Sequence, residues 1–357
     1  MTGFSKLSQD PLFVIKKFLL PKDFLLLCYT SKGIYEETKR IKFLVFNKKY
    51  SLKFYEDNKF RKRVFSSINN PSKQLSLNLS DCDNVRDVSV LSGVYKLNLS
   101  ECNRVTDVRS LGGVYSLNLS YTYISDVRAL SGVHTLDLSD CHNVRDVDAL
   151  GGVHTLDLSN CPNVSDVSAL GGVHTLDLSN CLNVSDVSAL GKVHTLDLSD
   201  SYNVFDVSAL GGVHTLDLWA CPNVSDVSAL GGVHTLDLSD CLNVTDVSAL
   251  GRVHTLNLSY TYISNVSALG GVYKLNLSEC NRVTDVSALG GVHTLNLRNC
   301  RNVSDVRALG GVYDLNLKDC RKVFNVRALS DVHTLNLKGC CNVNGISTLG
   351  NVVNLIR

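Results

Sequence analysis

The sequence predicts an α/β solenoid, a right-handed coil with one long parallel β-sheet and a convex side of 3₁₀ or extended turns. The first observation is repetition: VHTLDLSNCPNVSDVSALGG at 153–172 is followed by VHTLDLSNCLNVSDVSALGK at 173–192. The second is that Leu156 and Leu158 alternate with polar residues, which is the period of a strand with one buried face. The third is length, since twenty residues leave no room for a full helix on the returning side.

Each position of the copy at 153–172 has an expected role. Val153, Leu156 and Leu158 fill the strand side of the core, and Cys161 points inward at the turn. Val164, Val167 and Leu170 then line the returning side. Asp166 suits the N-cap of a short helical turn. Gly171 and Gly172 are expected to allow a tight turn with positive φ.

Fifteen strands are expected, the last one truncated. Two steps are nineteen residues long, and both contain Tyr-Thr-Tyr-Ile-Ser, at 121–125 and 260–264. The deletion falls in the turn after the strand, so the strand register should survive. The expected strands are marked by Leu77, Leu97, Leu117, Leu136, Leu156, Leu176, Leu196, Leu216, Leu236, Leu256, Leu275, Leu295, Leu315, Leu335 and Leu355.

The spacing L-x-x-L-x-L-x-x-C/N resembles the leucine-rich repeat, and residues 75–357 contain about 15 copies of it. The form L-x-L-S-x-C-x-N-V-x-D is similar to the cysteine-containing repeats of ubiquitin-ligase adaptors. The resemblance implies a surface that holds a protein partner. The repeats contain no nucleophile–base pair, phosphate loop or metal-ligand spacing, so we expect no enzyme activity and no cofactor.

The charge of the chain is unevenly distributed. Residues 1–70 carry 15 Lys and Arg against six Asp and Glu, a net charge of +9, whereas the remainder is −8. No apolar run is long enough for a membrane span, and the first residues lack a signal-peptide core. We therefore expect no membrane association and a cytoplasmic or nuclear location, or the host cytoplasm if the protein is viral.

Two repeat positions hold chemically versatile side chains. Eleven of the 13 cysteines share one position, and we interpret them as reduced core residues because no C-x-x-C spacing occurs. Nine of the ten histidines share another position, where Tyr95, Tyr115, Tyr273 and Tyr313 replace them. This exchange favours an amphipathic edge residue; a pH-sensitive surface is the alternative.

A run of aspartates is the main candidate for a binding surface. These residues are expected on the exposed concave side of six consecutive strands, with Asn at the same position before and after them. Three interpretations remain open: a solvated acidic face left by duplication, a docking strip for a basic partner, and a calcium site. The residues are Asp137, Asp157, Asp177, Asp197, Asp217 and Asp237.

Four further residues break the repetition on the same face. Trp219, the single tryptophan, replaces the usual concave Ser, and Arg298, Lys318 and Lys338 replace it near the C-terminus. Trp and Arg are favoured in binding hot spots, although one Trp is also consistent with sequence drift. The concave face is thus expected to change from acidic to basic and to hold an unknown target protein.

Residues 1–44 have a different, helical period, with helices expected near 11–19, 22–29 and 32–44. From Leu7 this segment resembles an F-box, with departures at Ser8, Pro11 and Ile34. The resemblance implies binding to the Skp-type adaptor of a cullin-RING ubiquitin ligase. The residues implied in that contact are Leu19, Pro21, Phe24, Leu25 and Leu27.

Together the two resemblances predict the substrate-recognition adaptor of a ubiquitin ligase. The alternative is a free-standing binding scaffold whose helical head only caps the solenoid. Residues 45–74 are expected to be a basic linker or N-terminal cap. Their Lys and Arg are interspersed with apolar residues as in an amphipathic helix, so nucleic-acid binding is not expected.

Overall fold

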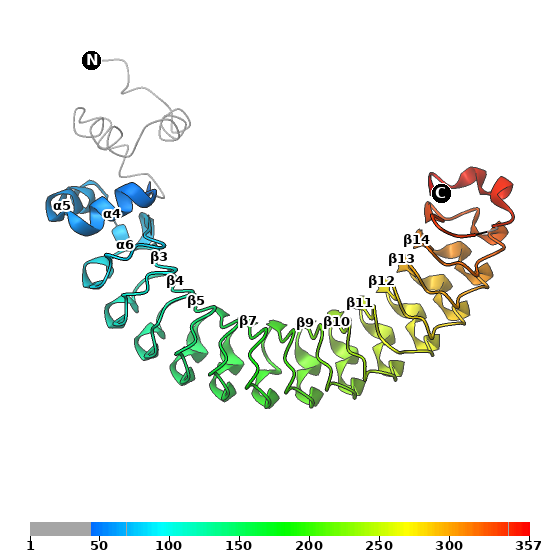
Figure 1. The fold of residues 1–357 in the computed structure, drawn as a ribbon, viewed down its shortest axis with the longest axis horizontal. Helices are drawn as coiled ribbons and strands as arrows, with labels where there is room; N and C mark the ends of the chain where they lie inside the picture. The colour runs from blue at the N-terminus through cyan, green and yellow to red at the C-terminus, as the bar shows by residue number, and fades with distance from the viewer. Residues whose placement is uncertain (1–43, 69, 342) are drawn as a thin grey trace, which may run out of the picture. The chain divides into compact units, whose positions relative to one another are not determined.

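The structure is a computed structural model that describes residues 44–68, 70–341 and 343–357. The chain divides into two compact units, one ending at Leu156 and one beginning at Asp157. Both are built from the same coil of strand, turn and 3₁₀ turn (Figure 1). The predicted leucine-rich-repeat solenoid with a parallel sheet is confirmed.

Short parallel strands form one side of each unit. In the first unit they are β1 (Leu44–Val45), β2 (Leu75–Asn78), β3 (Lys96–Asn98), β4 (Ser116–Asn118) and β5 (Thr135–Asp137). β6 (Thr155–Asp157) lies where the units meet in sequence. The second unit contains β7 (Thr175–Asp177), β8 (Thr195–Asp197), β9 (Thr215–Asp217), β10 (Thr235–Asp237), β11 (Thr255–Asn257), β12 (Lys274–Asn276), β13 (Thr294–Asn296), β14 (Asp314–Asn316), β15 (Thr334–Asn336) and β16 (Asn354–Ile356).

The fifteen predicted strands are β2 to β16, and β1 is an addition that sequence periodicity did not reveal. Register is kept across both nineteen-residue steps, because Leu117 pairs with Leu136 and Leu256 pairs with Leu275. The deletions therefore lie in the turns, as expected. The strand leucines from Leu77 to Leu335 are at most 3% exposed, whereas Leu355 in the last strand is half-buried.

The returning side of each coil is a 3₁₀ turn, as predicted, and these turns line the side opposite the strands (Figure 1). The turns are η2 (Ser89–Leu91), η3 (Arg109–Leu111), η4 (Arg128–Leu130), η5 (Asp148–Gly152), η6 (Ser168–Gly172), η7 (Ser188–Leu190), η8 (Ser208–Gly212), η9 (Ser228–Gly232), η10 (Ser248–Arg252), η11 (Ser267–Gly271), η12 (Ser287–Gly291), η13 (Arg307–Gly311), η14 (Arg327–Leu329) and η15 (Ile346–Asn351). The N-cap residue of η6 is Val167 and not Asp166, but the Asp166 carboxylate accepts the Ser168 N–H at 2.9 Å from one position earlier.

The expectation for the glycine pair was wrong. Gly171 and Gly172 are absent from the positive-φ residues, whereas Asn160 and Ala220 have φ of 57° and 53°. The left-handed residue of each repeat thus lies directly before the cysteine position. Gly171 is needed for another reason, since a Cβ there would overlap the Ala189 carbonyl oxygen of the next repeat.

Residues 45–74 contain three helices, α4 (Lys48–Glu56), α5 (Asn58–Ser67) and α6 (Pro71–Gln74). They cover the first edge of the sheet: β1 pairs with β2, and the buried Ser51 hydroxyl accepts the Asn78 N–H at 2.9 Å. Phe46, Phe54 and Phe60 pack their rings beneath the helices. The helix predicted near 32–44 does not extend to Leu44, which is in β1.

Candidate functional site

The predicted aspartates lie at the ends of strands, on the face of the sheet that looks away from the core. Asp137 ends β5 in the first unit, and Asp157 to Asp237 end β6 to β10 in the second. All six side chains are half-buried. Here and below, this surface of the second unit is called the strand face.

One carboxylate oxygen of each aspartate holds the turn that follows. In Asp177, Oδ1 accepts the Ser179 N–H at 2.9 Å and the Ser179 hydroxyl at 2.6 Å. Asparagine holds the turn in the same way, because Asn257 Oδ1 accepts the Ser259 N–H at 3.1 Å. The fold therefore requires an oxygen at this position and not a charge, which explains why Asp and Asn exchange along the chain.

Amides close the two ends of the aspartate run. Asn118 donates to Asp137 Oδ2 at 2.5 Å, and Asn257 donates to Asp237 Oδ2 at 2.8 Å. Within the described chain the structure gives no hydrogen-bond partner to Oδ2 of Asp177, Asp197 or Asp217. These three oxygens are free to accept donors from outside.

Two of the interior aspartates have a raised pKa. Burial, followed by the charges of Asp237 and Asp197, raises the pKa of Asp217 to about 6. Burial likewise raises the pKa of Asp177. A partner that brings positive charge would relieve this repulsion.

Trp219 follows Asp217 in the turn after β9. Its N–H donates to Asp217 Oδ1 at 2.8 Å, and its side chain is 45% exposed. Unlike Ser, it supplies no hydroxyl to the carboxylate, which adds to the raised pKa of Asp217. The indole thus lies exposed on the strand face, and the fold does not require it.

The basic residues occupy the same turn position four to six repeats further on. The N–H groups of Arg298, Lys318 and Lys338 donate to Asn296, Asn316 and Asn336. Their region is basic as a whole, with 11 Lys and Arg against six Asp and Glu in residues 258–357. Residues 157–257 contain 12 Asp against two basic residues.

A calcium or transition-metal site finds no support in this geometry. Among the described residues, no three His, Cys, Asp or Glu come together in a way that would hold a metal ion. The aspartates form a flat ladder with one residue per strand, and the oxygens of one repeat do not converge with those of another.

In the second unit the rings at the histidine position stack into a column beside the strand face, from His174 to His333. The ring centroids of His194 and His214 are 4.7 Å apart, and those of Tyr273 and His293 are 4.5 Å apart. In each repeat His Nδ1 lies near the next Thr hydroxyl, as in His174 and Thr175 at 3.3 Å. Stacking explains the exchange with Tyr, since either planar ring fits the column. Burial and neighbouring imidazoles lower the pKa of His194.

The cysteines form an inner ladder of S–H donors. Cys181 donates to the Leu158 carbonyl at 3.0 Å, and Cys221 to the Leu198 carbonyl at 3.1 Å. Burial raises the pKa of Cys181 to about 12, so its thiol stays protonated and inert. Ser201 occupies the same buried position, and its hydroxyl has no hydrogen-bond partner.

Sequence reasoning missed several members of these ladders. Thr122 and Thr261 replace Cys in the nineteen-residue repeats, each donating its hydroxyl to a Leu carbonyl at 2.6 Å. Their alignment with the cysteine position was the available signal. The preference for Asn, Asp or Gly just before the cysteine also marks the left-handed residue.

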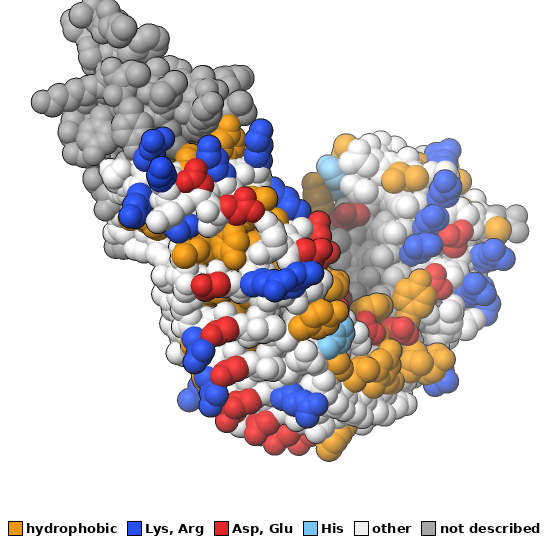
Figure 2. Space-filling model, turned by 60° about the vertical axis from the view of Figure 1, so that its left-hand side comes forward, with side chains coloured by type: hydrophobic (Ala, Val, Ile, Leu, Met, Phe, Trp, Pro, Cys, Tyr) orange, Lys and Arg blue, Asp and Glu red, His pale blue; other side chains and the backbone are white. Residues whose placement is uncertain are grey.

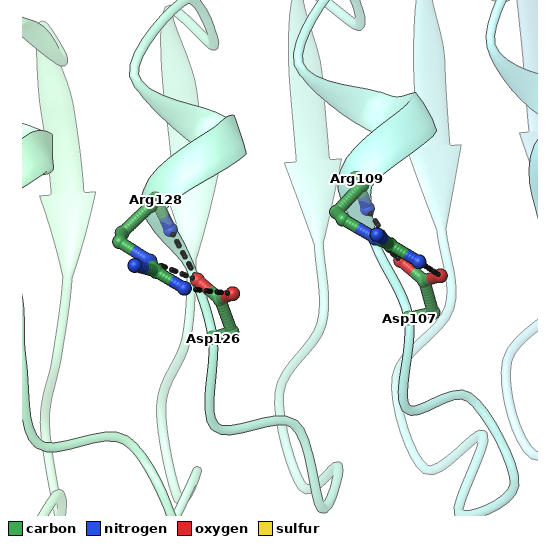
Figure 3. Close-up of polar contacts among 4 residues, drawn as sticks. All are labelled: Asp107, Arg109, Asp126 and Arg128. Atoms are coloured by element: carbon green, nitrogen blue, oxygen red, sulfur yellow. Dashed lines mark hydrogen bonds and ion pairs between the residues drawn. The ribbon is translucent and has the colours of Figure 1, made fainter.

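Charge on the outer side is arranged in local pairs in the first unit. Arg109 and Arg128, at the starts of η3 and η4, clasp Asp107 and Asp126 at 2.6 and 2.7 Å (Figure 3). Figure 2 shows acidic and basic side chains lying close together over this part of the surface. In the second unit Ser replaces Arg beside Asp166, Asp186, Asp206, Asp226 and Asp246, so these carboxylates are not neutralised by a basic residue two positions on.

The predicted adaptor-binding residues Leu19, Pro21, Phe24, Leu25 and Leu27 lie outside the described residues. Basic residues of the neighbouring cap make internal contacts. Arg61 donates to the carbonyls of Phe54 and Tyr55, and Lys48 pairs with Asp81 at 3.2 Å. No helix in the described part of the chain is both long and apolar enough to cross a membrane.

Comparison with known structures finds similar proteins at low sequence identity. An internalin from Listeria monocytogenes is 16% identical, with a TM-score of 0.60 over 95% of this chain and 96% of that one. The functional domain of InlJ from the same organism, described as including a cysteine ladder, is 17% identical with a TM-score of 0.46 over 73% and 67%. No family model matches the sequence, and no curated protein matches it. The likeness to the first internalin shows the leucine-rich-repeat fold.

Proposed function

We propose that this protein is a non-enzymatic scaffold that binds another protein on the strand face of its second unit. The supporting observation is that the face carries more than the fold requires. The turn needs a side-chain oxygen that accepts the N–H two residues on, and Asn supplies that oxygen as well as Asp does. The residue that donates this N–H can be of any type, since Arg298 donates it as Ser259 does. The fold therefore does not require the acidic run, the exposed Trp219 or the later basic residues.

The charge pattern suggests the polarity of the partner. Unpaired oxygens of Asp177, Asp197 and Asp217 would accept Lys or Arg side chains, and the Trp219 indole would add apolar or cation–π contact. Arg298 and Lys318 would meet acidic groups further along. Complementary potentials of this kind favour specificity and fast association.

The test begins with affinity capture of a partner by the wild-type protein from its own cells. The purified partner is then titrated against Trp219→Ala and against the triple variant Asp177→Asn, Asp197→Asn, Asp217→Asn. Asn keeps the turn oxygen, so the triple variant should fold normally and bind at least tenfold more weakly. Its matched control is Asp166→Asn, Asp186→Asn, Asp206→Asn on the outer side. Equal affinity of the two triple variants would contradict the proposal.

The ubiquitin-ligase adaptor is a finer proposal that rests on the resemblance of residues 7–44 to an F-box. No family model supports it. It predicts that the wild type co-purifies with a Skp-type adaptor and that Leu25→Asp, Leu27→Asp does not. Equal recovery of the Skp-type adaptor with both proteins would contradict this proposal and favour a head that only caps the solenoid. We also propose a cytoplasmic or nuclear location, where the buried thiols would stay reduced.

A further inference from the structure

A second exposed surface of the second unit has no role in the fold or in the strand face. The residue directly after the cysteine position is apolar in six consecutive repeats. We call this row the turn ridge; it consists of Pro162, Leu182, Tyr202, Pro222, Leu242 and Tyr262. The Leu and Tyr side chains are 37–48% exposed.

The backbone of the turn ridge is held on both sides. The preceding residue points inward, as Cys181 does when it donates to the Leu158 carbonyl. The ridge carbonyl itself is clamped by the next repeat: Asn203 donates to the Leu182 oxygen and Asn223 to the Tyr202 oxygen, both at 2.6 Å. The backbone of the turn ridge is thereby held in place, so little backbone entropy remains to be lost on binding.

The fold does not explain why the row is apolar. Asn281, Arg301 and Arg321 occupy the same position in later repeats and form the same turn. The order Pro, Leu, Tyr occurs twice, so three different apolar residues were retained together when the block was copied. The ridge ends where the Arg282 guanidinium lies 4.5 Å from the centre of the Tyr262 ring.

Acidic groups flank the turn ridge in sequence and in the coil. Asp200 and Asp240 come two residues before Tyr202 and Leu242. The only basic residues in 157–257, Lys192 and Arg252, are at the entry to the strands, away from the ridge turns. The surface is thus an apolar row with a negative rim.

We propose that the turn ridge binds an amphipathic, positively charged helix of the partner protein. Successive ridge residues are one strand spacing apart, about 4.8 Å. That spacing is close to the 5.4 Å pitch of a helix, so apolar residues on successive helical turns would meet successive ridge residues. Six repeats span about 24 Å, which corresponds to about 16 helical residues. Lys and Arg beside the apolar stripe would face the aspartates.

This inference rests on the proposed protein-binding function, and a synthetic probe tests it separately. The probe is a fluorescein-labelled 18-residue helix with Leu on one face and Lys beside it, titrated at physiological salt by fluorescence anisotropy. Two comparison peptides are a scrambled sequence of the same composition and a version with Glu for Lys. The wild type should bind the probe at least tenfold more tightly than either. Failure to discriminate would overturn the proposal.

Matched variants locate the binding. Leu182→Ser, Tyr202→Ser, Leu242→Ser should weaken probe binding at least tenfold. Its control, Tyr123→Ser, Phe324→Ser, Val353→Ser, removes three apolar side chains outside the turn ridge that are 57–66% exposed, and it should bind as the wild type does. Thermal melts of both variants check folding. If the ridge variant binds as well as the control, the turn ridge is not the site.

Two other outcomes distinguish this proposal from binding at the strand face and from self-association. Loss of probe binding in the Asp177→Asn, Asp197→Asn, Asp217→Asn variant, but not in the ridge variant, would overturn the ridge and leave the strand face as the binding surface. Self-association of the wild type that the ridge variant abolishes, seen by sedimentation velocity, would mean that a second copy occupies the ridge and would also contradict the proposal.

Discussion

The inner ladder contains one defect that makes a direct prediction about stability. Ser201 is fully buried at the cysteine position, and its hydroxyl has no partner. The cysteines of the neighbouring repeats reach the carbonyls of Leu158 and Leu198 at 3.0 and 3.1 Å. The C–O bond of serine is shorter than the C–S bond of cysteine, so its oxygen does not span the same gap. Ser201→Cys should restore the missing link to the Leu178 carbonyl.

The size of the effect follows from the cost of an unpaired buried hydroxyl, which is about 1–3 kcal/mol. The thiol would recover part of that as a weak hydrogen bond and better packing. We therefore expect Ser201→Cys to stabilise the protein by about 1 kcal/mol, which is a rise in melting temperature of about 2–4 °C for a unit of this size. The reverse change, Cys221→Ser, should lower stability by about 1–3 kcal/mol.

Differential scanning calorimetry under reducing conditions measures both variants and excludes a disulfide as the cause. Ser201→Ala is the control, because it removes the orphan hydroxyl without supplying a donor and should lie between the wild type and Ser201→Cys. A Ser201→Cys protein that is no more stable than the wild type would refute the S–H ladder as a source of stability. So would a Cys221→Ser protein of unchanged stability.

Three further predictions concern the other columns. Asp217→Asn keeps the turn oxygen and removes a charge. The Asp217 carboxyl has a pKa of about 6 in the folded protein, above its ordinary 3.8. The wild-type carboxylate therefore destabilises the fold increasingly as pH rises from about 4 to 6. Urea melts should therefore show a gain of about 1 kcal/mol at pH 7.5, allowing for solvent screening, and none at pH 3.5; a gain equal at both values would contradict the charge explanation. Gly191→Ala should destabilise by about 1–3 kcal/mol, since its Cβ meets the Ala209 carbonyl, whereas Gly350→Ala, with nothing within 4 Å, should not. His214→Tyr should change the melting temperature by less than 2 °C, about the effect of 0.5 kcal/mol, because either ring stacks in the column; a larger loss would show that imidazole itself is needed.

Periodicity was sufficient to predict the strands and 3₁₀ turns, because every repeat buries the same leucines and valines. It could not reveal the roles of residues whose partners lie one repeat away. Gly171 was assigned to a turn with positive φ because glycine often has that role, yet its function depends on the Ala189 carbonyl of the next repeat. The cap was similarly hidden, since Ser51 acts on Asn78 across 27 residues.

The aspartate column shows the same limit for function. From sequence alone, a solvated face, a docking strip and a calcium site were all consistent with six aspartates. The hydrogen bonds separate the two oxygens of each carboxylate: Oδ1 of Asp197 holds the turn through Ser199, while Oδ2 has no protein partner in the described chain. Asn at the flanking positions was the signal that the first role needs no charge.

The central claim is that the strand face binds a protein through features that folding does not require. The most direct measurement is the affinity of the captured partner for the Asp177→Asn, Asp197→Asn, Asp217→Asn variant, determined by isothermal titration calorimetry beside the outer-side control. The account predicts at least tenfold weaker binding for the strand-face variant, with its melting temperature equal to or above that of the wild type. Unchanged affinity in a stably folded variant would contradict it.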